Sequence, residues 1–126
     1  GNPYNSMDVT DPAATFGPLL RGADPLNLAY IHVADMALKD LDTLAFIRAN
    51  CRAPIIANNM LNAETGRALI DGGRADAISF GRAFIANPDL VERLKKAAPL
   101  AKPDYSLLYT GEEKGYVDYP ALDATA

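Results

Sequence analysis

The stretch at residues 74–90, RADAISFGRAFIANPDL, decides the fold of this chain. Within it, residues 76–80 form a compact and mostly apolar run that is typical of a short buried strand, and a glycine follows at once. The Asn-Pro-Asp run at 87–89 then offers an N-cap side chain, a proline suited to the first helical position and a carboxylate for the first turn. We therefore predict a strand, a turn at Gly81 and Arg82, and the start of a new helix.

The predicted turn has the residues of an anion site. Gly81 lets a bound group approach the backbone closely, and Arg82 carries a planar, permanently charged fork that suits phosphate. In barrels of alternating strands and helices, phosphate sites commonly lie on the loops after the late strands. On residue types alone, an ordinary strand-to-helix loop with a solvated arginine is the more common interpretation.

Two further strands with their helices precede this stretch. Residues 26–33, LNLAYIHV, are almost continuously apolar, as expected of a strand covered on both faces, and PIIA at 54–57 predicts a shorter strand. An amphipathic helix over 38–50 separates the two strands. A second helix, capped by Asn62 and ended by the glycines at 72–73, leads to the strand at 76–80. A short helix is also expected before the first strand, after the Asp-Pro pair at 11–12.

Strands that alternate with helices imply parallel pairing with right-handed crossovers. Three such strands do not close a barrel, and a complete (β/α)8 barrel typically needs about 250 residues. We therefore predict an α/β chain that is one domain over residues 1–126, the carboxyl-terminal portion of a (β/α)8 TIM barrel with about three βα units. The alternative is a small open three-layer sheet, which would expose strand edges on both sides.

A different composition begins near residue 99. Prolines and glycines interrupt residues 99–126, which we predict to be an irregular tail rich in tyrosine. Tyr105, Tyr109, Tyr116 and Tyr119 all lie there. A tyrosine can line the site of a flat aromatic ligand or can pin a tail to its domain through its hydroxyl group, and the sequence leaves both roles open.

Composition and charge exclude several classes of function. The net charge of -4 argues against nucleic acid as the main partner, because no basic stripe is present to neutralise phosphates. No apolar run approaches the length of a membrane span. A single cysteine, Cys51, with a single histidine, His32, disfavours a zinc site and an internal disulfide. We therefore expect a cytoplasmic protein with no bound metal.

The motifs carry a family resemblance. FGRAFIANPDLVERL, preceded by ADAIS and followed by GYVDYPAL, resembles the carboxyl-terminal part of the Old Yellow Enzyme family. Those proteins are FMN-dependent NAD(P)H oxidoreductases and ene reductases on a (β/α)8 barrel. The resemblance implies that residues 26–33, 54–57 and 76–80 are the sixth, seventh and eighth barrel strands. It also implies FMN as cofactor, NAD(P)H as reductant and an enone-type small molecule as substrate.

The resemblance assigns roles to particular residues. Gly81 and Arg82 match the residues that hold the FMN phosphate, by backbone amide and guanidinium respectively. Leu108 and Tyr109 match a Phe-Tyr or similar pair near the flavin ring, so Tyr109 is the candidate for the wall of the active site. His32 matches no catalytic residue and is expected to be a hydrogen-bonded packing residue.

The loop after the seventh strand departs from the family pattern. Asn58, Asn59 and Met60 stand where the family usually reads x-Gly-Gly or x-Gly-Asn, and where backbone amides meet the phosphate, so Asn59 and Met60 replace the glycines. Asparagine tolerates a left-handed backbone, whereas methionine does so much less readily. The resemblance therefore assigns these three residues to cofactor binding, with a backbone that the Met60 side chain disfavours.

No residue of this chain matches the family's catalytic residues, which lie in the first part of the barrel. The main hypothesis is therefore the carboxyl-terminal part of an FMN-dependent NAD(P)H oxidoreductase that reduces activated alkenes, inactive as an isolated chain. A second hypothesis is a non-catalytic module that binds phosphate or FMN. A third is a half-barrel that covers its exposed strand edges with the remaining barrel segment or by self-association.

Overall fold

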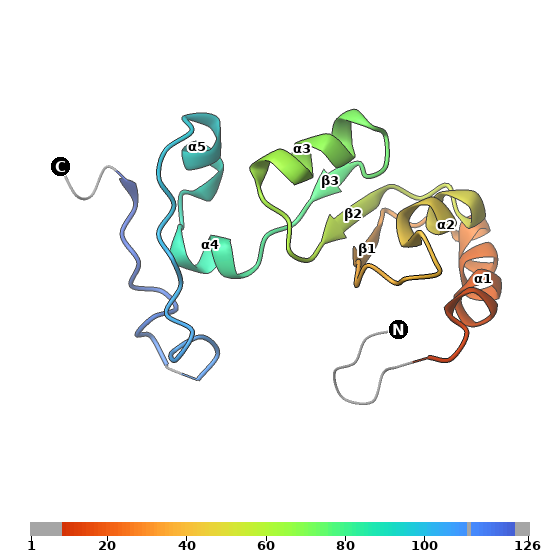
Figure 1. Cartoon of the computed structure of the whole chain (residues 1–126), viewed down its shortest axis with the longest axis horizontal. Coiled ribbons are helices and arrows are strands. Elements are labelled where there is room, and N and C mark those ends of the chain that lie inside the picture. The colour runs from red at the N-terminus through yellow and green to blue at the C-terminus, as the bar shows by residue number, and fades with distance from the viewer. Residues whose placement is uncertain (1–8, 111, 123–126) are drawn as a thin grey trace. The chain divides into compact units, whose positions relative to one another are not determined.

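The computed structural model describes residues 9–110 and 112–122 (Figure 1). Its helices and strands, in chain order, are α1 (Pro12–Ala23), the 3-10 helix η2 (Asp24–Leu26), β1 (Ile31–Ala34), α2 (Thr43–Asn50), β2 (Ile55–Asn58), α3 (Ala63–Asp71), β3 (Ala77–Ile78), α4 (Arg82–Ala86) and α5 (Leu90–Lys95). The chain divides into two compact units, Gly1–Ser79 and Phe80–Ala126, which are called unit 1 and unit 2 below. The prediction of a single domain stays a prediction.

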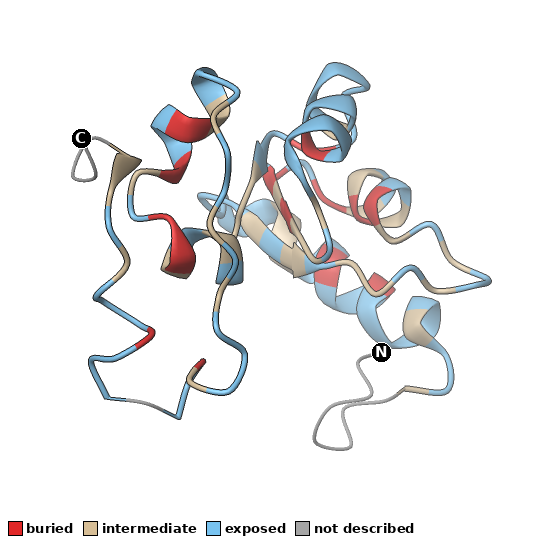
Figure 2. Cartoon of the chain, turned by 60° about the vertical axis from the view of Figure 1, so that its left-hand side comes forward, coloured by how far each residue is buried: buried red, intermediate tan, exposed pale blue. Residues whose placement is uncertain are grey.

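Unit 1 contains a parallel sheet in the order β1-β2-β3. Ile55 and Ala57 of β2 are buried, and they belong to the hydrophobic core of this unit together with side chains of α1 and α2 (Figure 2). On the neighbouring strands, Ile31, Val33 and Ile78 pack against the same core. The parallel pairing predicted from the alternation of strands and helices is confirmed.

The first strand is shorter than predicted. The apolar run at 26–33 predicted a strand throughout, but β1 begins at Ile31. Pro25 lies within η2, and Asn27 then ends that helix in a left-handed conformation with a φ of 51°. These two residues impose local backbone angles that an extended strand does not allow, so the strand forms only after them.

The other two strands are also shifted or shortened. The second strand, predicted at 54–57, spans Ile55–Asn58. The third, predicted at 76–80, is reduced to Ala77–Ile78. Asp76 lies just before β3, where its amide donates to the Ile55 carbonyl at 2.8 Å and its Oδ2 atom accepts a hydrogen bond from the Ile55 amide at 2.7 Å. The bond to Oδ2, with the ion pair from Arg48, lowers the pKa of Asp76 below its ordinary value.

The helices follow their capping residues. The helix predicted over 38–50 begins only at Thr43, because the Asp42 side chain accepts a hydrogen bond from the Ala45 amide and caps it there. Asn62 caps α3 as predicted, in a reciprocal capping box with Thr65. Among the described residues, no helix is long and apolar enough to cross a membrane.

The structure of unit 2 differs from two predictions made for residues 81–89. Gly81 and Arg82 do not form an isolated turn, because Arg82 is the first residue of α4. Asn87 does not cap the following helix; Asp89 occupies that position. Asn87 is instead fully buried. Its side-chain amide donates to the carbonyls of Ala83 and Ala101, and its oxygen accepts from the Ala101 amide.

Arg93 and Asp89 extend this buried polar cluster. The Arg93 guanidinium, 8% exposed, donates to Asp89 and to the backbone carbonyls of Pro99 and Pro120. Asp89 also accepts a hydrogen bond from the Leu122 amide, and these contacts, that with Arg93 foremost, lower the pKa of the Asp89 carboxyl. We call Asn87, Asp89 and Arg93 the polar hub. It holds the described part of the tail, which contains turns and no strand, to α4 and α5.

Candidate functional site

Polar side chains meet on the sheet face of unit 1 that the helices leave open. His32 on β1 and Asn58 at the end of β2 lie in register positions that alternate with the buried core residues. Ser79 follows β3, and its hydroxyl lies 2.7 Å from Nε2 of His32. The Asn58 side-chain amide donates to both the carbonyl and the hydroxyl of Ser79, each at 2.9 Å. His32 is therefore hydrogen-bonded, as predicted, but it is exposed in this chain.

The loop after β2 contains left-handed backbone angles of the kind that glycine usually adopts, but it contains no glycine. Asn59 and Met60 both adopt positive φ angles, of 92° and 53°. The Asn59 side chain donates to the Asp35 carbonyl at 2.7 Å, which ties this loop to the loop after β1. The Met60 side chain is 81% exposed. The sequence predicted that methionine disfavours this conformation, and the structure nevertheless holds it there, at a cost of about 1 kcal/mol.

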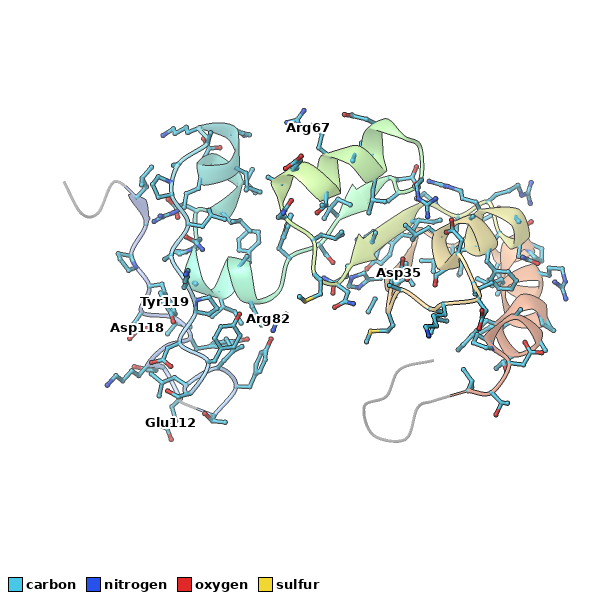
Figure 3. The ribbon with its side chains drawn as sticks, in the orientation of Figure 1. Asp35, Arg67, Arg82, Glu112, Asp118 and Tyr119 are labelled. Atoms are coloured by element: carbon cyan, nitrogen blue, oxygen red, sulfur yellow. The ribbon has the colours of Figure 1, made fainter. Side chains whose placement is uncertain are left out.

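Gly81 and Arg82 lie at the start of α4 in unit 2 (Figure 3). A Cβ atom built on Gly81 would meet no described atom within 4 Å, and its φ of -91° is one that other residues adopt. The packing of the described residues therefore does not require glycine here, whereas close approach of a bound group would. Arg82 is exposed, and its Cζ atom lies 5.7 Å from the centroid of the Tyr105 ring.

Tyr109 lies at the end of a tight turn in unit 2. The turn begins at Asp104, whose carbonyl accepts hydrogen bonds from the amides of Leu107 and Leu108. Leu108 is buried and anchors the turn, while Tyr109 has a left-handed backbone with a φ of 67° and a ring that is 69% exposed. A strained residue that presents an aromatic ring to solvent is compatible with a ligand-contacting role.

The predicted site residues thus form separate groups. Asn58, Asn59 and Met60 belong to one loop of unit 1, and Gly81 and Arg82 are consecutive in unit 2, where Tyr109 lies on its own turn. Sequence reasoning missed Ser79 and Tyr105. The alternation along 76–80 places Ser79 on the face opposite Ile78, so a period-two pattern could have found it. No local pattern could have paired Tyr105 with Arg82. Among the described residues, no group of acidic, histidine or cysteine side chains could hold a metal ion.

Comparisons with known proteins give a consistent result. The profile of the NADH:flavin oxidoreductase / NADH oxidase family matches residues 17–101. A 12-oxophytodienoate reductase-like protein of Solanum lycopersicum is 38% identical over 126 residues, which cover 99% of this chain and 36% of that protein. Among solved structures, morphinone reductase in complex with tetrahydroNAD superposes with a TM-score of 0.85 at 36% identity, covering 94% of this chain and 32% of that one.

A second solved structure, the old yellow enzyme from Trypanosoma cruzi, has a TM-score of 0.81 at 37% identity, covering 90% of this chain and 31% of that one. This chain therefore spans about a third of the length of the proteins that it matches. The prediction of a portion of an α/β barrel with parallel strands is confirmed by these matches.

Proposed function

This chain belongs to the NADH:flavin oxidoreductase / NADH oxidase family, and from that premise we propose that it is the carboxyl-terminal part of an FMN-dependent NAD(P)H oxidoreductase that reduces activated alkenes. The net charge of -4 supports a small-molecule substrate over nucleic acid. The lone Cys51, a buried free thiol, supports a reducing compartment, which we take to be the cytoplasm.

The observation that carries the proposal is the pairing of Gly81 with Arg82 at the start of α4. Open space beside the Gly81 backbone and an exposed guanidinium on the next residue suit the phosphate end of FMN. Bound FMN supplies the hydride chemistry between NAD(P)H and the alkene. Arg82 would bind the phosphate, and Tyr109 of the same unit would form one wall of the flavin site. The assignment of Asn58, Asn59 and Met60 in unit 1 to cofactor binding stays a prediction.

The described residues contain no group to which we assign a catalytic role. Cofactor chemistry requires a positioned flavin ring and a pocket that excludes water. One phosphate-binding arginine, one loop and one aromatic wall do not form such a pocket. We therefore expect the isolated chain to lack ene-reductase activity and to retain at most the binding of the phosphate end of FMN.

An FMN titration of the 126-residue chain tests this assignment. Arg82→Ala should weaken FMN binding roughly tenfold or more, because it removes charge-assisted hydrogen bonds to a phosphate. Arg67→Ala, which removes an exposed arginine from α3 in unit 1, is the matched control and should leave the affinity unchanged. Riboflavin, which lacks the phosphate, should bind equally to the wild-type chain and to Arg82→Ala.

Two results would contradict the proposal. Equal FMN binding by the wild-type chain and Arg82→Ala would remove Arg82 as the phosphate ligand. A full-length protein, with the remaining barrel joined to this chain, that showed no flavin absorption in the visible range would remove the oxidoreductase assignment itself.

A second candidate function rests on an apolar cavity along β1. The cavity, of about 380 Å³, lies between α1, β1 and α2 within unit 1. Its lining includes Phe16 and Leu19, which are 40% and 63% exposed. Within the described residues β1 is also an edge strand. Ile31 donates to the carbonyl of Pro54, just before β2, and Asp35 donates to Asn58, so the amides of His32 and Ala34 face away from β2. Exposed apolar surface beside an unpaired strand edge favours association.

We propose that this face binds the remaining barrel segment or, in the isolated chain, a second copy. Sedimentation velocity at rising concentration should therefore show a mass above that of the monomer. Leu19→Lys should shift the chain toward monomer, because it places a charge at the cavity. Val91→Lys, at a similarly exposed apolar position in α5, should not. A monomer at every concentration would contradict self-association.

A further inference from the structure

The Arg82 guanidinium lies over the face of the Tyr105 ring within unit 2. The distance of 5.7 Å from Cζ of Arg82 to the ring centroid is within the range of a cation–π contact. Tyr105 is 67% exposed and Arg82 is also exposed, so no surrounding core forces the two side chains together. An aromatic ring beside an exposed guanidinium reduces the rotamer freedom of that side chain.

The backbone that carries Tyr105 is itself held in place. Its neighbour Asp104 accepts hydrogen bonds through Oδ1 from the amide and the hydroxyl of Ser106, at 2.9 and 2.6 Å. These bonds lower the pKa of the Asp104 carboxyl. The Asp104 amide in turn donates to the hydroxyl of Tyr119 at 2.7 Å (Figure 3 labels Tyr119). The turn therefore presents the Tyr105 ring from a fixed backbone position.

A cation–π contact and a bound phosphate make different demands on a guanidinium. The cation–π contact is an electrostatic attraction to the face of the ring and requires no N–H hydrogen bond. A phosphate accepts hydrogen bonds from the N–H groups at the edge of the guanidinium plane. Both contacts can therefore be made together, and a side chain already oriented by the ring loses less entropy when the anion binds.

We propose that Tyr105 is a positioning residue that orients Arg82 for a phosphate monoester, here the terminal phosphate of FMN. The inference rests on the proposed role of Arg82 as the phosphate ligand and adds the residue that sets its geometry. Tyr105 acts through Arg82 and does not contact the flavin ring.

The stack can be tested without ligand. In NMR spectra of the 15N-labelled chain, the Hε proton of Arg82 should be shifted upfield by the ring. Tyr105→Leu should move it downfield, and Tyr105→Phe, which keeps the aromatic face, should leave it close to the wild-type position. Tyr116→Leu removes another exposed tyrosine from unit 2 and serves as the control. An unchanged Arg82 signal in Tyr105→Leu would overturn the proposal.

Ligand titrations then separate positioning from a general structural role. Tyr105→Leu should weaken FMN binding roughly two- to fivefold, the size expected of an exposed cation–π contact, and should leave riboflavin binding unchanged. Tyr105→Phe should bind FMN as the wild-type chain does. In an Arg82→Ala background, Tyr105→Leu should have no further effect, because the residue that it orients is gone.

The outcomes distinguish this inference from the assignment on which it rests. If Arg82→Ala weakens FMN binding and Tyr105→Leu does not, Tyr105 is not a positioning residue although Arg82 still binds the phosphate. If Tyr105→Leu weakens FMN and riboflavin equally, Tyr105 contacts the flavin or maintains the fold, and the proposal is wrong. If Arg82→Ala has no effect on FMN, both the phosphate assignment and this inference fail.

Discussion

Asn87→Leu should destabilise unit 2 by about 3 kcal/mol. The Asn87 side chain is 0% exposed and makes hydrogen bonds to the Ala83 carbonyl and to both backbone groups of Ala101. Leucine has the same number and branching of side-chain heavy atoms but satisfies none of these groups, and each buried group left without a partner costs about 1 kcal/mol or more. Hydrogen exchange followed by mass spectrometry should show the loss of protection in peptides from residues 80–122.

One further variant at this position and one control in unit 1 separate the contributions of the individual hydrogen bonds. Asn87→Asp keeps the acceptor for the Ala101 amide but loses the donors to two carbonyls, so it should also be strongly destabilising at neutral pH. Asn50→Leu is the control: it removes a partly buried amide that donates to the Phe46 carbonyl and accepts from Arg21 in unit 1, and it should cost about 1–2 kcal/mol. Protection in Asn87→Leu equal to the wild type would show that the hub does not hold this unit.

Ile55→Ala should destabilise unit 1 by about 4 kcal/mol. Ile55 lies on the central strand β2, its side chain is 0% exposed, and it packs in the core formed with α1 and α2. Truncation of a fully buried isoleucine removes its transfer free energy and leaves a cavity, and such substitutions cost about 2–5 kcal/mol. Urea unfolding monitored by exchange in peptides from residues 9–79 should show a lower midpoint.

Ile70→Ala and Ile55→Val calibrate this result. Ile70 lies on α3 and is 39% exposed, so its truncation should cost less than about 1 kcal/mol. Ile55→Val removes one methylene group and should cost about 1 kcal/mol. If Ile55→Ala were no more destabilising than Ile70→Ala, the assignment of β2 as the buried centre of the sheet would be wrong.

The sequence predicted the elements well wherever a residue acts on its immediate neighbours. Asp11 and Asn62 cap α1 and α3 as expected, because each bonds an amide three residues away. The limits of β1 were missed where local angles at Pro25 and Asn27 overrode an apolar pattern. A prediction from periodicity uses only the spacing of apolar residues. It does not include the backbone angles that Pro25 and Asn27 adopt.

Asn87 illustrates why the rest could not be predicted. An asparagine before a proline and an aspartate has the local pattern of an N-cap, and the same residue is equally suited to a buried hydrogen-bonding role. Its partner Ala101 lies beyond the following helix, so only the folded chain distinguishes the two. The same holds for the site. The motif at residues 80–90 singles out Arg82 from sequence alone. Only the folded chain brings the Tyr105 ring next to the Arg82 guanidinium.

The polar hub also determines where this polypeptide can be shortened. Arg93 donates to the Pro120 carbonyl, and Asp89 accepts from the Leu122 amide. A stop codon placed before Pro120 would delete both contacts and leave a nearly buried guanidinium with fewer acceptors. An affinity tag attached after residue 122 would leave both contacts in place, so expression boundaries for crystallisation or spectroscopy are better set beyond that residue.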